Sequence, residues 1–484
     1  MFKKQVELIK SITYKDASKA PYFGQDSLVY RSLIKLFEAF WIYSKKELYL
    51  VGGCVRDLLL GKEPKDYDLC TNATPDEVKE ICETLRLKTF DSGIKHGTIT
   101  ILDDFYNMQY EITTYRIDGK YEDGRHPDEV IFTPSLEEDL KRRDFTINSF
   151  AYNLLQHEVL ALDESYFDDL SYGIIRAVGN AETRFNEDAL RMLRALRFSA
   201  QLNFIIAKDT YYAIKTCAPL LSKISKERIR DELTKILLSD NPQVLELFVE
   251  AGLEPFAFGF TPIGDVLACE HENPWHYTDV FHHSIDVVKR VPKTFVSRWA
   301  ALMHDFGKPA VKTLKEPGHY SYHGHEKVSV EIAEQLSDLL KFSNEQKDLI
   351  LKFIKYHDFE LAECRNGTFK RILSDIGVKN FIEFMKLKYA DATAHYIVKQ
   401  TKYAVDILDK TFERFTKIIN EKQPLVVSDL AINGYDLMDL GLQGKQVGDC
   451  LNYLTEAVLE DASKNTNEIL ISLAKEWRDS NGKH

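Results

Sequence analysis

The stretch LYLVGGCVRDLLLGKEPKDYDLCTNA, residues 48–73, decides how the first part of this 484-residue chain folds. Its opening hydrophobic residues are typical of a β-strand, and the run stops at Gly52-Gly53. The residues that follow have helical spacing up to Gly61, and Pro64 closes a loop before the next β-prone run. The stretch therefore predicts a strand, a glycine turn, a short helix, a loop and a second strand.

Two carboxylates stand at the start of the second predicted strand. Asp66 and Asp68 are two positions apart, so on a strand they point to the same face. A divalent cation relieves their repulsion, and Mg²⁺ suits a site whose other ligands are phosphates. Gly52 and Gly53 let the backbone approach a phosphate chain, and Arg56 adds a positive charge. A glycine pair alone is usually a turn, and a D-x-D pattern alone is usually a solvated strand edge. Together, in this order and at this spacing, they favour a phosphoryl-transfer site.

Composition limits the classes of protein to which the chain can belong. Its length suits about three or four domains, and 44% of its residues are hydrophobic. The seven cysteines show no C-x-x-C spacing, which argues against a disulfide framework or a zinc knuckle. We expect a soluble, cytoplasmic protein, because we find no signal peptide and no long apolar run. The net charge of −12 argues against indiscriminate polyanion binding, yet permits RNA on a local basic strip.

The surrounding residues complete a predicted catalytic head. Residues 1–47 are expected to be helical and to pack on the back of a sheet, and residues 75–85 should form a helix that starts at a Thr-Pro pair. Residues 98–102 and 110–115 alternate as strands do. Glu111 lies on the second of these strands and is the candidate third carboxylate, although a solvated strand residue is an equally good interpretation.

A polar, glycine-rich segment, residues 116–139, predicts a mobile loop, and mobile loops beside active sites often carry function. Once the family resemblance given below is taken into account, this loop is expected to gate the change from C to A. The basic residues at 141–143 follow, and residues 145–155 are expected to form a helix. Simple surface charge would explain a basic pair. Beside a triphosphate site, however, Arg143 is expected to contact phosphate or base.

Beyond residue 174 the pattern becomes helical. Asn186 is predicted to cap a helix whose first turn contains Asp188, and Arg191 lies one turn later on the same face. Arg194 and Arg197 extend this stripe, while leucines occupy the other side. The ordinary explanation of such a stripe is a salt-bridged solvent face.

Hydrogen-bond chemistry suggests a sharper interpretation of Asp188 and Arg191. A carboxylate only accepts and a guanidinium only donates. Cytosine and adenine each offer an amino donor beside a ring-nitrogen acceptor, which matches this pair, whereas uracil and guanine present the opposite order. One Asp–Arg pair could therefore admit C and A and reject U and G without a nucleic-acid template.

The blocks GGCVRDLLLG, DYD, RRDFTIN, IRAVGN and EDALRMLRALRF together resemble the class II tRNA nucleotidyltransferases, which are the CCA-adding enzymes and poly(A) polymerases of the polymerase-β superfamily. The resemblance implies that Asp66 and Asp68 bind Mg²⁺. Glu111 remains the candidate third carboxylate from its place on the predicted strand, with a solvated strand residue as the alternative. The resemblance also implies a set of nucleotide-binding residues, in which Glu187, Asp188 and Arg191 act as an amino-acid template. That set is Gly53, Arg56, Arg143, Glu187, Asp188, Arg191, Arg194 and Arg197. Gly52 is added to the nucleotide-binding residues because of the glycine turn described above.

Histidine and aspartate recur in a fixed order in the second half of the chain. The series H…HD…H…H…D is formed by His283, His304, Asp305, His325, His357 and Asp391. It resembles the HD superfamily of metal-dependent phosphohydrolases. The resemblance implies a site made by His283, His304, Asp305 and Asp391, whose mixed ligands suit Ni²⁺, Mn²⁺, Fe²⁺ or Mg²⁺ more than structural zinc. The alternative is a vestigial RNA-binding body.

The expected fold class is α+β, with a small mixed-sheet head followed by a mostly α-helical neck, HD body and tail. The predicted domains are a nucleotidyltransferase head at 1–173, a neck at 174–240, a body at 241–423 with the HD domain at about 275–400, and a tRNA-binding tail at 424–484. Gly441, Gly444 and Gly448 in the tail could open a helix that binds a tRNA phosphate, or could simply punctuate helices.

The function expected from these patterns is template-independent addition of C, C and A to the 3′ end of a tRNA that lacks all or part of it. CTP and ATP are the substrates, pyrophosphate is released, and two Mg²⁺ ions serve the head. A poly(A) polymerase, or an A-only or CC-only enzyme, remains an alternative, as does an HD phosphohydrolase with an inert head. Neither DNA nor a membrane is expected as a partner.

Overall fold

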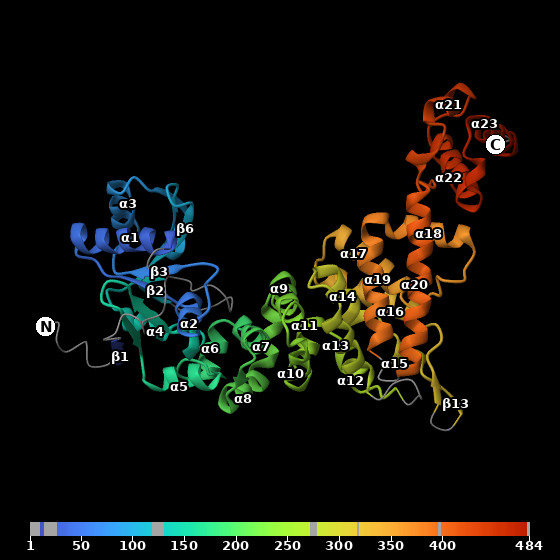
Figure 1. Cartoon of the computed structure of the whole chain (residues 1–484). Helices are drawn as coiled ribbons and strands as arrows, with labels where there is room; N and C mark the ends of the chain where they lie inside the picture. Colours follow the sequence, from blue (N-terminus) through green and yellow to red (C-terminus); the bar gives the residue numbers. More distant parts are fainter. Residues whose placement is uncertain are drawn as a thin grey trace. The chain divides into compact units, whose positions relative to one another are not determined.

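The computed structural model describes residues 10–13, 27–118, 130–271, 278–316, 319–394 and 398–481. The chain divides into two compact units. One contains Met1–Ile236 and Val244–Gly259, and the other contains Leu237–Gln243 and Phe260–His484. The expected fold class is confirmed, because a mixed sheet forms in the first unit and the rest of the described chain is mostly helical (Figure 1). The four predicted domain ranges stay a prediction.

An eight-stranded sheet is the core of the first unit. Its strand order is β1-β10-β9-β2-β3-β6-β5-β4, with β3 and β6 parallel and the other neighbouring pairs antiparallel. The strands are β1 (Lys10–Thr13), β2 (Leu48–Val51), β3 (Asp68–Thr71), β4 (Lys88–Gly93), β5 (Thr98–Asp103), β6 (Met108–Thr114), β9 (Phe150–Asn153) and β10 (Glu158–Ala161). All four residues of β2 are buried, so this strand is covered on both faces.

Helices α1 (Leu28–Ser44) and α3 (Pro75–Thr84) contact each other and the sheet. In α1 the buried apolar side chains recur with helical spacing, at Leu33, Leu36, Phe37 and Phe40. In α3 the Thr74 side chain accepts from the Glu77 amide, and the Glu77 carboxylate accepts from the Thr74 amide, which forms a capping box. The remaining head helices are α2 (Gly53–Leu59), α4 (Leu136–Lys141) and α5 (Ser165–Tyr172).

Two predictions about the head were wrong. Residues 145–155 do not form a helix: Thr146–Asn148 form a single 3-10 turn and β9 follows. Strand β9 lies between β10 and β2, and its first three residues are buried, so it presents a continuous apolar run that resembles a buried helix in sequence. The N-terminal segment is also not helical throughout, because its residues 10–13 form strand β1.

The predicted loop at 116–139 is partly ordered. Strands β7 (Arg116–Asp118) and β8 (Val130–Phe132) pair with each other, and α4 begins within the same segment. The gating prediction falls mostly on residues 119–129, which lie outside the described residues.

The neck part of the first unit corrects the predicted helix start. Helix α6 (Ala181–Glu187) is capped by Asn180, and the next helix, α7 (Leu190–Leu202), begins after a break at Asp188. Asn186 is therefore inside α6 and caps nothing, and Asp188 precedes α7 rather than lying in its first turn. Further elements are β11 (Ile174–Ile175), β12 (Ile205–Ile206), α8 (Lys208–Cys217), α9 (Lys226–Leu237), α10 (Leu245–Glu250) and α11 (Glu254–Phe258).

The second unit is built from helices and one hairpin, β13 (Thr313–Glu316) with β14 (His319–Ser321). Its helices are α12 (Pro262–Leu267), α13 (Val280–Arg290), α14 (Phe295–Met303), α15 (Lys308–Val311), α16 (His325–Leu339), α17 (Asn344–Tyr356), α18 (Asn366–Ile376), α19 (Val378–Thr393), α20 (Val398–Asn420), α21 (Gly434–Asp439), α22 (Lys445–Glu460) and α23 (Asn467–Asn481). Helices α21 to α23 share a separate apolar cluster around Leu437 and Leu454. No helix in the described ranges is both long and apolar enough to span a bilayer.

The glycines of the tail surround the start of α22. Gly441 and Gly444 have φ of 88° and 53°, and Gly444 is the residue that precedes α22. Gly448 is inside the helix. Binding of a tRNA phosphate at this turn stays a prediction.

Candidate active site and metal centre

The carboxylates of the head meet where β3 begins, next to β6. Asp68 is the first residue of β3, and the parallel register places it directly opposite Glu111 on β6. Asp66 precedes β3 in a bend, so strand alternation does not orient it as predicted. The pKa of the Asp68 carboxyl is raised, first by exclusion of solvent and then by the charges of Glu111 and Asp66, while Arg143 opposes the shift. A divalent cation would relieve this crowding of negative charge.

The glycine turn brings Gly52 and Arg143 together. Gly52 has φ of 75°, and a Cβ placed on it would lie 3.2 Å from Nη1 of Arg143. Nη2 of Arg143 pairs with the buried Asp139 at 3.1 Å. Nε of Arg143 is buried and has no hydrogen-bond partner within the described part of the chain. The bare glycine turn therefore lies directly beside an arginine, as the predicted phosphate-binding role of these residues requires, and that role stays a prediction.

A buried network connects two of the predicted phosphate-binding arginines. Arg56 donates from Nη1 to Asn148 Oδ1 at 2.7 Å, and Asn148 donates from Nδ2 to Asp144 Oδ1 at 3.2 Å. Asp144 Oδ2 accepts from Arg194, with the Nη2 atom at 2.6 Å. Burial would raise the pKa of Asp144, but the charges of Arg194 and Arg191 lower it to about 2. The R-R-D-F-T-I-N block thus positions arginines from two other segments.

Phe198 supports three guanidinium groups. The Cζ atoms of Arg56, Arg194 and Arg197 lie 5.2, 5.5 and 4.3 Å from the centre of its ring. Arg197 is only 9% exposed and donates from Nη1 to Glu232 at 3.0 Å. Arg197 is therefore part of the packing beneath the site, and sequence reasoning missed its partners Phe198 and Glu232.

The predicted template residues are close in sequence but hold different partners. Glu187 pairs with Arg184 at 2.5 Å and with Arg191 at 2.6 Å. Arg191 also donates to the backbone carbonyls of Arg184, at 3.2 Å, and Arg142, at 2.9 Å. Asp188, just ahead of α7, accepts at Oδ1 from the Leu190 amide at 3.0 Å. Glu187 thus orients the Arg191 guanidinium, whereas Asp188 contacts Arg191 through its backbone carbonyl, which accepts from the Arg191 amide at 3.0 Å.

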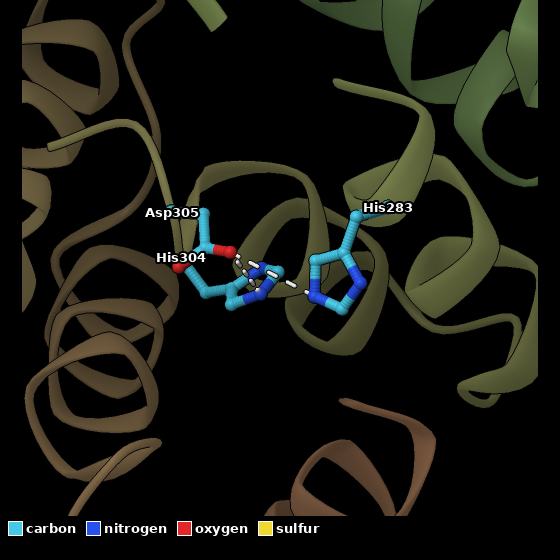
Figure 2. A group of neighbouring side chains, drawn as sticks. All are labelled: His283, His304 and Asp305. Carbon is cyan, nitrogen blue, oxygen red and sulfur yellow. Dashed lines mark ion pairs between the residues drawn. The ribbon is translucent and has the colours of Figure 1, made fainter. Parts of the chain in front are cut away.

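The HD residues converge in the second unit. His283 on α13 and the His304-Asp305 pair after α14 point toward one another (Figure 2). Asp305 Oδ2 lies 3.2 Å from His304 Nε2 and 3.7 Å from His283 Nε2, and Asp391 Oδ1 lies 3.0 Å from His283 Nε2. The prediction that these four side chains assemble therefore agrees with the geometry.

A second group shares Asp305 with the first. Asp305 Oδ1 lies 3.2 Å from His325 Nε2 and 3.8 Å from His357 Nε2, whose two Nε2 atoms are 3.1 Å apart. Among the described residues, the groups with three possible ligand atoms within 4.8 Å of one another are His283–His304–Asp305 and Asp305–His325–His357. His325 and His357 were part of the sequence series but were not assigned as ligands.

Backbone contacts orient the imidazoles of this cluster. His304, His325 and His357 each donate from Nδ1 to a carbonyl in the preceding turn, those of Ala301, Tyr322 and Ile354, at 2.8, 3.0 and 2.6 Å. Because a carbonyl can only accept, Nδ1 of each ring carries a proton. The other ring nitrogen, Nε2, faces the cluster, and in a neutral imidazole it carries the lone pair that can bind a metal ion. Burial lowers the pKa of His357 to about 3, which favours the neutral, metal-binding form. The donor set fits a divalent metal ion.

Lys308 was missed by sequence reasoning. Its Nζ lies 2.6 Å from Asp305 Oδ2 and 3.2 Å from His271 Nε2. His271 donates from Nδ1 to Thr278 at 2.7 Å, and burial, followed by the charge of Lys308, lowers its pKa to about 3. The buried lysine therefore pairs with the aspartate that the two candidate metal-binding groups share. The spacing of Asp305 and Lys308 was the available signal.

Comparison with known proteins agrees with this arrangement. Three families match consecutive parts of the chain: "Poly A polymerase head domain" at 48–176, "Probable RNA and SrmB- binding site of polymerase A" at 203–258, and "HD domain" at 280–392. A CCA-adding enzyme of Enterococcus faecalis is 33% identical over 442 residues, which cover 89% of this chain and 92% of that protein. The chain belongs to the CCA-adding enzyme family. It is thus a member of a nucleotidyltransferase family, and the recognition made from the motifs is confirmed.

The share of a relative's length that this chain covers differs among the other family members. A CCA-adding enzyme of Leuconostoc mesenteroides is 53% identical over 204 residues, which are 42% of this chain and 48% of that protein. The chain spans about half the length of this and similar curated relatives. The Bacillus stearothermophilus CCA-adding enzyme, solved in complex with CTP, has a TM-score of 0.67 and 27% identity over 94% of this chain and 98% of that chain. The Thermotoga maritima enzyme complexed with tRNA, at 19% identity and a TM-score of 0.58, shows the same fold.

Polymerase and HD domains of these kinds typically use divalent metal ions, and the HD cluster contains residue groups that could hold them. The identity of each metal, the role of each predicted site residue and the cellular location stay predictions.

Proposed function

We propose that this chain adds C, C and A to the 3′ end of tRNA from CTP and ATP and releases pyrophosphate. The observation that carries the proposal is the pairing of Asp68, at the start of β3, with Glu111 on the neighbouring strand β6, next to the arginines that surround the glycine turn. Full-length similarity to the Enterococcus faecalis enzyme, and structural similarity to a family member solved with CTP, support it.

Each group in the head has a part in the proposed reaction. Asp66, Asp68 and Glu111 would hold Mg²⁺, which lowers the pKa of the attacking 3′-hydroxyl and stabilises charge on the triphosphate. Arg56, Arg143 and Arg194 balance phosphate charge, while the Gly52-Gly53 turn lets the phosphates approach the backbone. The buried network through Asn148 and Asp144 keeps two of these arginines in place before substrate binds, so little reorganisation is needed.

Base choice is assigned to Asp188 and Arg191. Asp188 accepts from the amino group that cytosine and adenine share, and Arg191 donates to the adjacent ring nitrogen. Uracil and guanine would place a carbonyl oxygen against the carboxylate, and this mismatch costs about 1–3 kcal/mol for the unsatisfied polar groups. In the structure Glu187 fixes the Arg191 guanidinium, which suits a residue that must present one geometry.

The proposal is tested with purified protein, a tRNA that lacks its last three nucleotides, and labelled CTP or ATP with Mg²⁺. We expect two C additions, then one A that depends on prior C addition. A run of A residues would indicate a poly(A) polymerase, and addition of only C or only A would indicate a partial enzyme. No incorporation with either nucleotide would refute the proposal.

We also propose that the HD cluster is a metal-dependent phosphohydrolase site. The inward Nε2 atoms of three histidines, set around a shared Asp305, support a working metal site over a vestigial fold. A divalent ion such as Ni²⁺, Mn²⁺, Fe²⁺ or Mg²⁺ would supply a water activated for attack on phosphorus. The test measures release of p-nitrophenol from mono- and bis-p-nitrophenyl phosphate by metal-depleted protein, with each ion added back. Absence of hydrolysis with every ion would refute the proposal.

A further inference from the structure

Helix α9 presents two charged side chains toward the predicted nucleotide-selecting residues. Arg228 and Glu232 are four positions apart, so they lie on one face of the helix. Arg228 Nη2 lies 3.3 Å from Asp188 Oδ2, and Glu232 Oε1 lies 3.0 Å from Arg197 Nη1. These contacts connect α9 to Asp188, which lies just before α7, and to Arg197 on α7.

Asp188 lies in the break between two helices. Its amide donates to the Arg184 carbonyl at 3.3 Å and its carbonyl accepts from the Arg191 amide at 3.0 Å, so its backbone is held but its side chain is not within a helix. Its backbone is extended, with φ of −139° and ψ of 104°, between the end of α6 and the start of α7. The Leu190 amide donates to Oδ1 of Asp188, so one oxygen of the carboxylate is held. The orientation of the carboxylate plane then depends on the partner of the second oxygen, Oδ2. Arg228 is the side chain that fixes Oδ2. A base-reading carboxylate must point in one direction, and Arg228 provides the second of the two anchor points.

Arg228 keeps donor capacity that its present contacts do not use. Its Nη1 atom is buried and has no hydrogen-bond partner among the residues the structure describes. A buried, unpaired guanidinium nitrogen is costly, so it indicates a group that becomes paired in another state. A carboxylate has about four lone-pair sites, so an Asp188 held at both oxygens can still accept from a nucleobase amino group.

We propose that Arg228 is a positioning residue for nucleotide selection. It orients the Asp188 carboxylate so that this acceptor meets the amino group of cytosine or adenine and opposes the carbonyl oxygen of uracil or guanine. The inference rests on the proposed function, since it concerns the same base-reading site. Arg228 acts through Asp188 and touches no reacting atom.

A purely structural role for Arg228 makes a different prediction. Loss of a packing contact would lower the stability of the neck and reduce the use of every nucleotide by a similar factor. Loss of a positioning contact changes the ratio of kcat/KM for CTP to that for UTP and leaves the melting temperature nearly constant. The change in this ratio caused by replacing Arg228 also disappears when Asp188 has already been replaced, because Arg228 acts through Asp188.

The test compares single-nucleotide addition by the full chain on a tRNA that lacks its last three nucleotides. The variants are Arg228→Gln, Arg228→Lys, Asp188→Ala, and Arg228→Gln combined with Asp188→Ala. Arg228→Met, judged by the same criteria, keeps the test decisive if the glutamine variant does not fold. Arg230→Ala is the matched control, because this arginine of α9 pairs with Asp231 in the same helix.

We expect Arg228→Gln to lower the CTP-to-UTP ratio of kcat/KM about tenfold, the effect of one charge-assisted hydrogen bond. Arg228→Lys should recover most of the ratio, Arg230→Ala should leave it unchanged, and the combined variant should match Asp188→Ala. An unchanged ratio, an equal loss for both nucleotides, or additive effects in the combined variant would overturn the inference. Failure of the unmodified protein to add C would instead refute the proposed function, so the two failures are distinguishable.

Discussion

Replacement of Asp144 by asparagine tests the network that positions the arginines of the head. Asp144 is 8% exposed and its Oδ2 atom pairs with Arg194 at 2.6 Å. The substitution keeps the size of the side chain and removes its charge, so the Arg194 guanidinium loses its closest counter-ion. The Arg194 side chain is 35% exposed, so solvent screens part of the loss, and we expect a cost of about 1–3 kcal/mol rather than that of a fully buried ion pair. We expect this loss of local stability near neutral pH, together with weaker use of nucleoside triphosphates.

The pKa of Asp144 gives the effect a pH dependence whose sign is defined. Burial opposes ionisation, but the nearby arginines lower the folded-state pKa from the usual 3.8 to about 2. The depressed pKa adds stability that is fully present above pH 4 and is lost as pH falls toward 2. The shift corresponds to about 2.5 kcal/mol, of which about half is already lost at pH 3. The free-energy difference between the unmodified protein and Asp144→Asn should therefore be about 1 kcal/mol smaller at pH 3 than at pH 6.

The assay is hydrogen exchange in increasing urea, followed on peptides from α7, because these report on the part of the chain that contains Arg194. Asp168→Asn is the control, since Asp168 is an exposed aspartate on α5. An equal difference between Asp144→Asn and the unmodified protein at pH 3 and pH 6 would refute the reasoning. The same conclusion would follow if the control reproduced the pH dependence of Asp144→Asn.

Four further substitutions test other parts of the site. Asp68→Ala should abolish nucleotide addition at an unchanged melting temperature, because it removes a candidate metal ligand at the start of β3 and no core volume; normal incorporation would exclude the metal role. Gly52→Ala should lower kcat/KM by about tenfold or more, because a side chain is strained at φ of 75° and a Cβ 3.2 Å from Nη1 of Arg143 would displace that guanidinium, and steady-state kinetics would detect it. Asp188→Ala should slow addition of C and A and increase misincorporation of U or G, as measured with each of the four triphosphates; unchanged discrimination would place base choice elsewhere. His304→Ala with Asp305→Ala should remove metal binding, measured by calorimetry, and spare CCA addition; loss of addition without a change in melting would show that the two sites are not independent.

The sequence by itself determined the local framework of the head and the order of the motifs. Gly52 was identifiable because only glycine adopts its backbone conformation without strain. Helix α3 was identifiable because its Thr-Pro start and its capping glutamate are encoded within four consecutive residues. The HD series was identifiable because its residues recur in a fixed order. Each of these features depends on short-range chemistry or on a pattern that survives without coordinates.

Only the tertiary structure decided which of these residues meet. Asp68 and Glu111 come from strands whose parallel pairing no local pattern specifies. Asp144 and Arg194 are 50 residues apart, and their contact depends on how the head meets α7. The helix break at Asp188 and the strand β9 were also misjudged from sequence. A buried apolar run and a charged stripe look the same in sequence in several different folds. Which fold forms depends on residues from distant parts of the chain, because burial and ion pairing depend on distances in space.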